Sequence, residues 1–328
     1  MKRALAFILA ISLSPTAMAA TLIVPNQYGN IQLAIDASSD GDTVLVSPGY
    51  YMYVLGFRII GKSIHVVSEK GPDVTTIANY AEPPSGETGS YAFYIESVPG
   101  PCTISGFKME GHRPGDMAMN NFTIKIWNSN VRITGNVFVH NYQHSVLDIE
   151  GSSSPLIEYN VFTINTATSI IIRDGSSPTI ERNTFSANPW HEQIWIMGDN
   201  SHPVIRCNVI VNGNMDGPYS YSYGVKASTP AENIVFECND VWNNATANYS
   251  GTLPDQTGIN GNISEDPLFC GIPGSGNFYL QSNSPCAEEN APAFCSGQYM
   301  GCFPVLCTVG TKEESWGSIK SRFGEGKK

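Results

Sequence analysis

The feature that most constrains this sequence is an asparagine that recurs between apolar residues. Each has an apolar residue three positions before it and another two positions after it, and the set is Asn136, Asn160, Asn183, Asn208 and Asn239. The steps between them are 24, 23, 25 and 31 residues. A repeat of about 20 to 50 residues without a helical pattern predicts a solenoid of stacked β-coils. Because Asn tolerates left-handed backbone and bonds to backbone at turns, we expect a hydrogen-bonded ladder along one corner.

The first 19 residues have the pattern of a secretory signal peptide. Lys2 and Arg3 precede an apolar run, and a small-x-small triplet ends at Ala19. The pattern predicts cleavage near Ala19 and a protein that is secreted, periplasmic or on the cell surface. No later segment has the roughly 18 consecutive apolar residues of a membrane span, so we expect none.

The charge of the chain limits its partners. The formal net charge is −11, and removal of Lys2 and Arg3 would make it more negative. Nucleic acid is therefore not an expected partner, since its phosphates are held by clustered Lys and Arg. A polyanionic substrate is also disfavoured unless a local basic patch or a bound cation intervenes.

Each coil from residue 122 onward divides into three short strands. The first strand group consists of FTIKIW, SVLDIEG, SIIIRDG, QIWIMGD and YGVKAS, and each ladder asparagine lies between the second and third strands. Near the N-terminus Ile31, Ala34 and Ile35 have helical spacing, which predicts a short helix covering the first coil. We therefore predict an all-β, single-stranded parallel solenoid over residues 20–285, a cysteine-rich cap over 286–307 and a tail over 308–328.

Several segments resemble the right-handed parallel β-helix superfamily, which includes pectate lyases and polygalacturonases. They are IQLAIDASSDGDTVLVSPGYY, the stretch from Gly61 to Ile77 with its GK and GP pairs, and the N-x-F coils. The resemblance covers about residues 22–285 and implies the fold. It does not imply one activity, because this fold carries lyases, hydrolases, epimerases and non-catalytic adhesins. The NTD, DD, HG and RIK elements of polygalacturonases are absent, as are the characteristic motifs of pectate lyases and alginate epimerases.

Four longer connections separate the third strand of one coil from the first strand of the next. They span residues 110–121, 140–145, 188–193 and 212–223. Since one corner of successive coils stacks, we expect these connections to form a wall beside the first strand group. Aromatic rings cover apolar sugar faces and charged groups bond to hydroxyls or carboxylates. The expected substrate-binding residues are therefore Trp190, His191, Trp195, Tyr219, Tyr221 and Lys226.

The candidate catalytic residues are Asp148, Glu150, Arg173, Asp174 and His144. A glycoside hydrolase needs two carboxyl groups about 5 to 10 Å apart, and Asp148 and Glu150 lie one coil, about 4.8 Å, before Asp174. A polysaccharide lyase needs a base and a cation, which Arg173 with His140 or His144 would supply. The residues require no cofactor and predict no metal site, and only the resemblance brings Ca²⁺ into consideration.

The chain has eight cysteines, which in an exported protein favour disulfides. Cys207 and Cys238 each precede a ladder asparagine, so they hold equivalent places in neighbouring coils. A coil spacing of about 4.8 Å suits a disulfide, and we predict that this pair is bonded. The pairing of the others stays open: Cys102, Cys270, Cys286, Cys295, Cys302 and Cys307.

Two classes of function fit the sequence. The first is binding of polysaccharide or cell-envelope glycan on the face made by the first strand group and its loops, with cleavage by a lyase or hydrolase left open. The second is a non-catalytic structural or adhesive protein of the cell surface or envelope, attached through the tail. In that tail Trp316, Ile319 and Phe323 have the spacing of a short amphipathic helix, although a loose tail fits as well.

Overall fold

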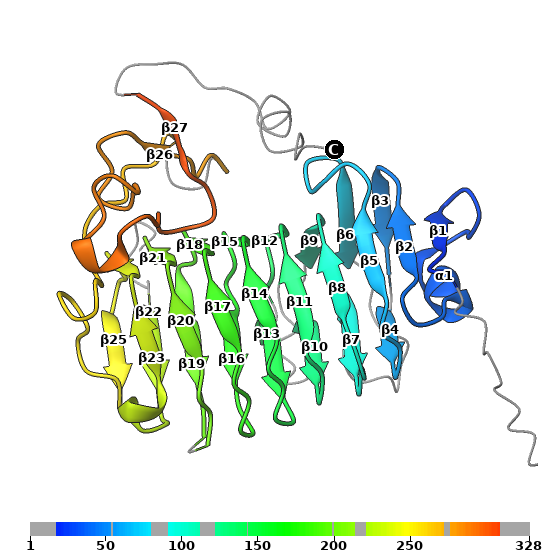
Figure 1. Ribbon diagram of the computed structural model, residues 1–328, viewed down its shortest axis with the longest axis horizontal. Coiled ribbons are helices and arrows are strands. Elements are labelled where there is room, and N and C mark those ends of the chain that lie inside the picture. The colour runs from blue at the N-terminus through cyan, green and yellow to red at the C-terminus, as the bar shows by residue number, and fades with distance from the viewer. Residues whose placement is uncertain are drawn as a thin grey trace, which may run out of the picture.

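The strands of successive coils form three long parallel sheets. The computed structural model describes residues 18–53, 55–79, 91–111, 122–142, 144–198, 200–213, 221–271 and 276–308. Within these ranges sheet A has nine strands, and sheets B and C have eight each. Figure 1 shows the strands side by side along the long axis of the molecule. The chain thus climbs by one strand spacing per coil, as the asparagine repeat predicts.

The strands are short and recur in a fixed order through the sheets. Sheet A consists of β1 (Thr21–Val24), β2 (Thr43–Val46), β5 (His65–Ser68), β8 (Cys102–Ser105), β11 (Val131–Thr134), β14 (Leu156–Glu158), β17 (Thr179–Glu181), β20 (Val204–Arg206) and β23 (Val235–Glu237). Sheet B consists of β3 (Gly49–Met52), β6 (Thr75–Asn79), β9 (Lys108–Gly111), β12 (Val137–Val139), β15 (Val161–Thr163), β18 (Thr184–Ser186), β21 (Val209–Val211) and β24 (Asp240–Trp242). Sheet C consists of β4 (Phe57–Ile60), β7 (Phe93–Glu96), β10 (Phe122–Trp127), β13 (Ser145–Glu150), β16 (Thr168–Ile172), β19 (Trp190–Ile196), β22 (Tyr221–Ala227) and β25 (Ala247–Gly251). Sheet C contains the predicted first strand group.

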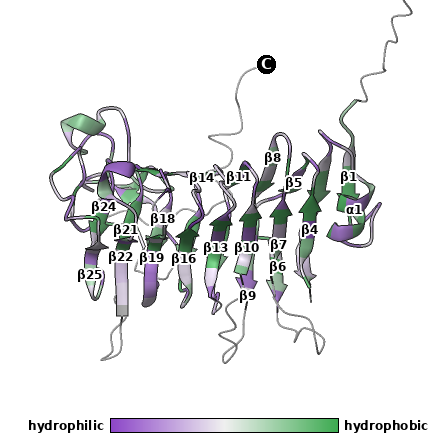
Figure 2. Cartoon of the chain, turned by 90° about the horizontal axis from the view of Figure 1, so that it is seen from below, coloured by the Kyte–Doolittle hydropathy of each residue, from purple (hydrophilic) through white to green (hydrophobic). Residues whose placement is uncertain are grey.

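The core is the space enclosed by the three sheets. Identical residues stack in it from coil to coil: the ring centroids of Phe138 and Phe162 are 4.8 Å apart, and those of Phe162 and Phe185 are 4.6 Å apart. Figure 2 shows hydrophobic strands along the length of the solenoid. Because each buried ring contacts its equivalents above and below, packing of one coil depends on its neighbours.

The predicted N-terminal helix is confirmed as α1 (Ile31–Ala37), with Ile31, Ala34 and Ile35 buried. The Asn30 side chain accepts a hydrogen bond from Leu33 N and caps the helix. Gln32 pairs with the backbone of Arg58 on the edge strand β4: its Oε1 accepts from the amide at 2.8 Å and its Nε2 donates to the carbonyl at 3.3 Å. The helix therefore covers the open end of the solenoid and part of a sheet edge.

The asparagine ladder forms at the corner between sheets A and B. The amide Nδ2 of Asn136 donates to Asn160 Oδ1 at 3.1 Å, and each later member donates in the same way to the next. The ladder extends one residue further than expected, because Asn239 Nδ2 donates to Asn262 Oδ1 at 3.2 Å. The left-handed residue is the one before each asparagine, for example Tyr159 at φ 53° and Arg182 at φ 53°. The asparagine points inward to its bonds while its predecessor makes the turn and points outward.

A second ladder lies at the corner between sheets B and C. Asn141 Nδ2 donates to Asn165 Oδ1 at 2.8 Å, Asn165 Nδ2 to Asn188 Oδ1 at 3.2 Å, and Asn188 Nδ2 to Gln193 Oε1 at 2.8 Å. This ladder was not expected. It holds the corner from which the sheet C strands begin.

Residues beyond the last solenoid strand form a cap stapled by two disulfides. β26 (Leu280–Gln281) pairs with β27 (Val305–Cys307), and Cys270 is bonded to Cys307. In the cap, the short 3-10 helix Ala293–Cys295 precedes residues 296–302, which lie on the solenoid. A second 3-10 helix, Ala231–Asn233, belongs to the solenoid and precedes β23. The cap buries the outer face of sheet B near β21 and β24.

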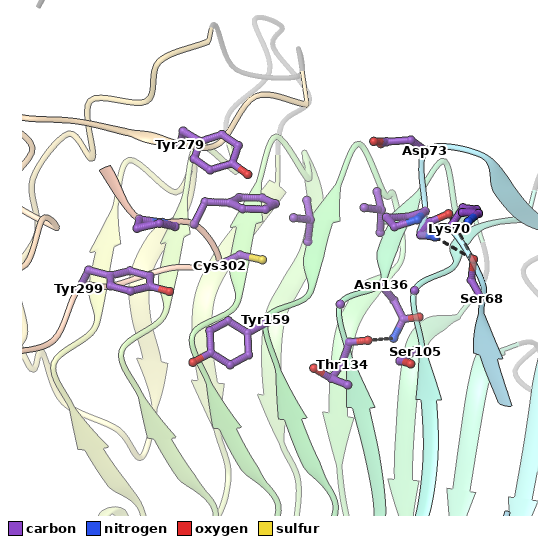
Figure 3. Close-up of a pocket in the computed structure, with 18 residues that line it drawn as sticks. Ser68, Lys70, Asp73, Ser105, Thr134, Asn136, Tyr159, Tyr279, Tyr299 and Cys302 are labelled. Atoms are coloured by element: carbon purple, nitrogen blue, oxygen red, sulfur yellow. Dashed lines mark hydrogen bonds between the residues drawn. The ribbon is translucent and has the colours of Figure 1, made fainter. Parts of the chain in front are cut away.

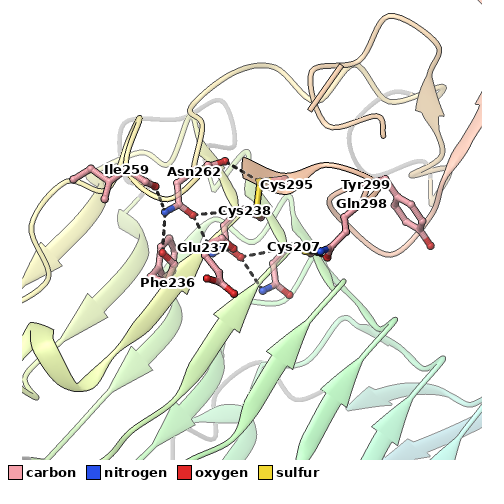
Figure 4. Close-up of a disulfide and its surroundings, with 12 residues drawn as sticks. Cys207, Phe236, Glu237, Cys238, Ile259, Asn262, Cys295, Gln298 and Tyr299 are labelled. Carbon is pink, nitrogen blue, oxygen red and sulfur yellow. Dashed lines mark hydrogen bonds between the residues drawn. A yellow bond between two sulfur atoms is a disulfide. The ribbon is translucent and has the colours of Figure 1, made fainter. Parts of the chain in front are cut away.

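The predicted disulfide between Cys207 and Cys238 is wrong. Cys238 is bonded to Cys295 of the cap, with Cα atoms 5.7 Å apart, while the Cys207 thiol donates to Gln298 Oε1 at 3.0 Å (Figure 4). Both cysteines have left-handed backbone, at φ 54° and 55°. Equivalent residues of stacked coils have parallel Cα–Cβ directions, so both side chains point out toward the cap instead of toward each other.

Candidate functional site

The outer face of sheet C carries a continuous row of side chains in matching register. From β4 to β25 the row contains Arg58, Tyr94, Lys125, Asp148, Ile171, Trp195, Lys226 and Ser250. Strand alternation sends the neighbouring isoleucines and leucine of these strands into the core and leaves this row facing outward. The first half of the row contains Tyr94 and three charged residues, and the second half contains the indole of Trp195.

Four charged residues on β10, β13 and the turn after β16 form a closed set of ion pairs. Lys125 Nζ lies 3.4 Å from Asp148 Oδ2 and 2.7 Å from Glu150 Oε2. The guanidinium of Arg173 contacts the same two carboxylates, at 2.5 Å to Asp148 Oδ2 and 2.6 Å to Glu150 Oε1. Each carboxylate therefore has two cationic partners, and each cation has two anionic partners.

This pairing changes the expected role of Asp148 and Glu150. The Asp148 side chain is 0% exposed, and burial raises the pKa of its carboxyl while the hydrogen bonds and charge of Arg173 oppose that shift. Glu150 is buried too. Asp174 does not join them: it is exposed in the turn that follows β16, with φ 55°. The structure thus brings together three of the predicted catalytic residues, Asp148, Glu150 and Arg173. With Lys125 they form ion pairs in which every charge is balanced.

The second half of the row is organised around Lys226. Its ammonium nitrogen lies 2.9 Å from Glu192 Oε1, 4.6 Å from the Trp195 ring centroid and 5.7 Å from that of Tyr223. The Trp195 side chain is partly exposed, but its Nε1 is buried and has no hydrogen-bond partner in the described part of the chain. Because this nitrogen is buried, only the exposed part of the Trp195 ring is accessible to a ligand.

Two histidines lie where the sheet C strands begin. His144 packs edge-on against Phe122, with ring centroids 6.1 Å apart, and its Nδ1 is buried without a hydrogen-bond partner. Burial lowers the pKa of His144, and the charges of Arg173 and His191 lower it further while Glu192 opposes them. The imidazole is therefore neutral at neutral pH, and its Nδ1 makes no hydrogen bond with the described residues.

Comparison with known proteins identifies the fold family. The family described as right handed beta helix region matches residues 91–265, more than half of the chain. The chain belongs to the right-handed β-helix family. No curated protein matches the sequence significantly. Family membership confirms the expected fold and fits a polysaccharide-related or a structural protein.

The prediction of a wall of loops beside sheet C of this β-helix is partly wrong. Trp190, His191 and Glu192 belong to strand β19, which is longer than its neighbours and pairs with β22 from Trp190 onward. Trp190 is 44% exposed at the start of that strand. Tyr221 lies in β22. Tyr219 and most of the two longest connections, 112–121 and 214–220, lie outside the described residues.

Sequence reasoning noticed Glu192 and Tyr223 only as parts of an expected loop. Their place opposite each other in β19 and β22 gives Lys226 its partners. The available signal was the continuation of strand composition upstream of QIWIM and YGVKA. No group of three or more His, Cys, Asp or Glu side chains in the described ranges is arranged to hold a metal ion. Nor does any helix there have the length and apolarity to cross a membrane.

Proposed function

We propose that this β-helix binds polysaccharide along the outer face of sheet C. The observation that carries the proposal is Trp195, whose partly exposed ring lies beside Lys226 on the outer face of sheet C. An exposed aromatic face suits a sugar ring, whose C–H face stacks on the indole while its hydroxyls bond to neighbouring charged groups. The exposed ring of Trp190, five residues earlier on the same strand, offers a second aromatic surface.

The charge balance around Trp195 and the ion-pair set supports a neutral glycan. Three cations, Lys125, Arg173 and Lys226, are matched by three carboxylates, those of Asp148, Glu150 and Glu192. Because each of these three cations is already neutralised, this part of the face has no surplus positive charge for a chain of uronates. Paired charges can still bond to sugar hydroxyls, which need both donors and acceptors.

The same pairing disfavours cleavage by Asp148 and Glu150. A glycosidase needs one carboxyl group able to give up a proton and another free to attack or to activate water. Here both are held by Lys125 and Arg173. Binding without cleavage is therefore the function that the geometry supports best.

A glycan panel tests the proposal. The purified protein is screened against plant, algal and bacterial glycans for binding and for release of reducing or unsaturated ends. We expect a neutral glycan to bind, with affinity that changes little between low and high salt. Trp195→Ala should weaken that binding by about tenfold or more, roughly 1.4 kcal/mol, whereas Phe294→Ala, which removes an exposed ring from the cap, should not.

The panel also distinguishes the alternatives. Binding of only uronate-rich glycans, weakened by salt, would contradict the neutral-glycan assignment. Release of new ends, abolished by His144→Gln, would show an enzyme instead of a binding protein. Failure of every glycan to bind would favour the structural or adhesive role.

We also propose that the protein is exported. The support is the disulfides Cys238–Cys295 and Cys270–Cys307, which persist in oxidising compartments, together with the signal-peptide pattern of the first 19 residues. Expression of the full chain followed by mass spectrometry of the exported fraction tests this. A mature N-terminus at Ala20 is expected, and retention of the intact Met1 chain in the cytoplasm would contradict it.

A further inference from the structure

A trough lies on the opposite side of the solenoid from the proposed glycan face, beside the asparagine ladder. It has a volume of about 520 Å³. In Figure 3, Tyr159, Tyr279, Tyr299 and Cys302 lie at one end, and Ser68, Lys70 and Asp73 lie at the other. This volume is in the range of ligand pockets, about 300 to 1,000 Å³.

The trough is open at Gly135, whose coil lacks a side chain there, whereas a Cβ on Gly106 of the preceding coil would meet Ser68 Cβ at 3.2 Å. The residue before each ladder position points outward, and successive coils place Gly106, Gly135, Tyr159, Arg182, Cys207 and Cys238 there. A Cβ on Gly135 would meet nothing within 4 Å. The backbone does not require glycine at this place, since Tyr159 and Arg182 adopt φ 53° against 65° for Gly135. Glycine at this position therefore keeps a space open.

The cap follows this row of residues and stops at the trough. Cys295 is bonded to Cys238, Gln298 contacts Cys207, and the Tyr299 ring lies 4.9 Å from the Arg182 guanidinium carbon. The last contact between this cap segment and the solenoid is made by Cys302, whose N donates to Thr184 Oγ1 at 2.9 Å. The next two residues, Phe303 and Pro304, face the trough. The wall on this side is thus mainly aromatic, and it suits an apolar ring rather than a charged group.

We propose that the trough binds the C-terminal segment of the chain itself, residues 309–328, with Trp316 as the residue that enters the space beside Tyr159 and Gly135. The described chain ends at Thr308, four residues after Pro304 on the trough wall. The four residues from Pro304 to Thr308 can carry the chain at most about 13 Å away from the trough wall. The eight residues from Thr308 to Trp316 can span about 26 Å, which is more than that distance. Trp316 can therefore return to the trough.

Attachment and charge favour this occupant. The disulfide Cys270–Cys307 fixes the point at which the segment leaves the cap, so the segment is presented to the trough at high effective concentration. Residues 309–328 contain five basic and three acidic side chains, whereas the whole chain has a net charge of −11. A basic segment is drawn to an acidic body, and Trp316 supplies the ring that the aromatic wall suits.

The test uses full-length protein labelled with 5-fluorotryptophan and followed by ¹⁹F NMR. The chain has five tryptophans, and Trp316→Phe identifies the resonance of interest. In the unaltered protein the Trp316 resonance should differ from its position in urea and should be shielded from a soluble gadolinium chelate. Gly135→Tyr, which fills the trough, should return it to the urea position and remove the shielding.

Gly61→Tyr is the matched control. Gly61 has φ 63°, and a Cβ there would meet nothing within 4 Å, as at Gly135, but Gly61 follows β4 at another corner. The substitution should leave the Trp316 resonance unchanged. The resonances of Trp127, Trp190, Trp195 and Trp242 report whether each variant is folded, and Gly135→Arg, which repeats the Arg182 side chain, replaces Gly135→Tyr if that variant does not fold.

Three results would overturn the proposal. The first is a Trp316 resonance that is unshielded in the unaltered protein. The second is equal shielding in the unaltered and Gly135→Tyr proteins. The third is shielding that disappears on dilution, which would mean that the segment of a second molecule occupies the trough.

Discussion

The Lys226 ammonium nitrogen lies 4.6 Å from the centroid of the Trp195 ring, on the neighbouring strand of sheet C. The same nitrogen is 2.9 Å from Glu192 Oε1, whose side chain is almost fully buried. One lysine therefore neutralises a buried carboxylate and fixes the position of an indole.

We expect loss of the Lys226 charge to destabilise the protein. Lys226→Met should lower the free energy of unfolding by about 2 kcal/mol or more, because Glu192 would remain buried without its cation. Arg206→Met, which breaks the more exposed pair with Glu181, should cost less than about 1 kcal/mol. Urea unfolding followed by circular dichroism measures both, and equal losses would contradict the assigned burial of Glu192.

We expect loss of a buried ladder asparagine to lower the free energy of unfolding much more than loss of an exposed asparagine. The Asn183 amide donates to Ile157 O, Glu181 O and Asn208 Oδ1, and its Oδ1 accepts from Asn160. Asn183→Ala leaves several of these groups buried without partners and should cost about 3 kcal/mol or more.

The matched control is Asn130→Ala, which removes one exposed bond to Ser154 N and should cost less than about 1 kcal/mol. Thermal unfolding of the two variants compares them. Similar melting temperatures would show that the ladder contributes little to stability.

The lowered pKa of His144 predicts a pH dependence of stability. Burial holds the folded-state pKa of His144 below 6.5, so the unfolded chain binds the proton more readily. Its contribution to stability is present above about pH 6.5 and is lost as the pH falls from there toward the folded-state pKa. His144→Gln should flatten this part of the curve of melting temperature against pH, and His202→Gln, at an exposed site, should not. A curve unaffected by His144→Gln would contradict the burial assigned to His144.

The disulfides can be mapped chemically. After alkylation of the unfolded, unreduced protein, peptide mass spectrometry should find Cys238 linked to Cys295 and Cys270 linked to Cys307. Alkylated thiols are expected at Cys102, Cys207, Cys286 and Cys302. A peptide linking Cys207 to Cys238 would restore the pairing that the coil spacing suggested.

The fold could be predicted from the sequence because each coil repeats the same physical problem. An apolar strand, an inward asparagine and a turn recur together. A coil whose own pattern is ambiguous can therefore be assigned from the coils before and after it. The second ladder is present in the same repeat, five residues after the first, as Asn141, Asn165 and Asn188. Assigning Asn141 and Asn188 to the longer connections 140–145 and 188–193 concealed it.

The candidate site was predicted only in part, because contact across coils depends on side-chain direction. Register places Asp148 beside Lys125, but their mutual pairing with Glu150 and Arg173 is visible only in three dimensions. The error at Cys207 has the same origin. Coil spacing gave the correct separation, whereas outward-pointing side chains gave Cys238 a partner 57 residues away.

The most direct test of the central claim is the indole Nε1–H resonance of Trp195 in ¹⁵N-labelled protein. The resonance is assigned by its absence in Trp195→Phe and followed while a neutral glycan identified by the panel is added. Because a sugar stacked on the partly exposed ring changes the surroundings of the whole indole, the resonance should shift with the same midpoint as glycan binding. Saturation with the bound glycan while the Trp195 resonance stays unchanged would contradict binding on the face of sheet C.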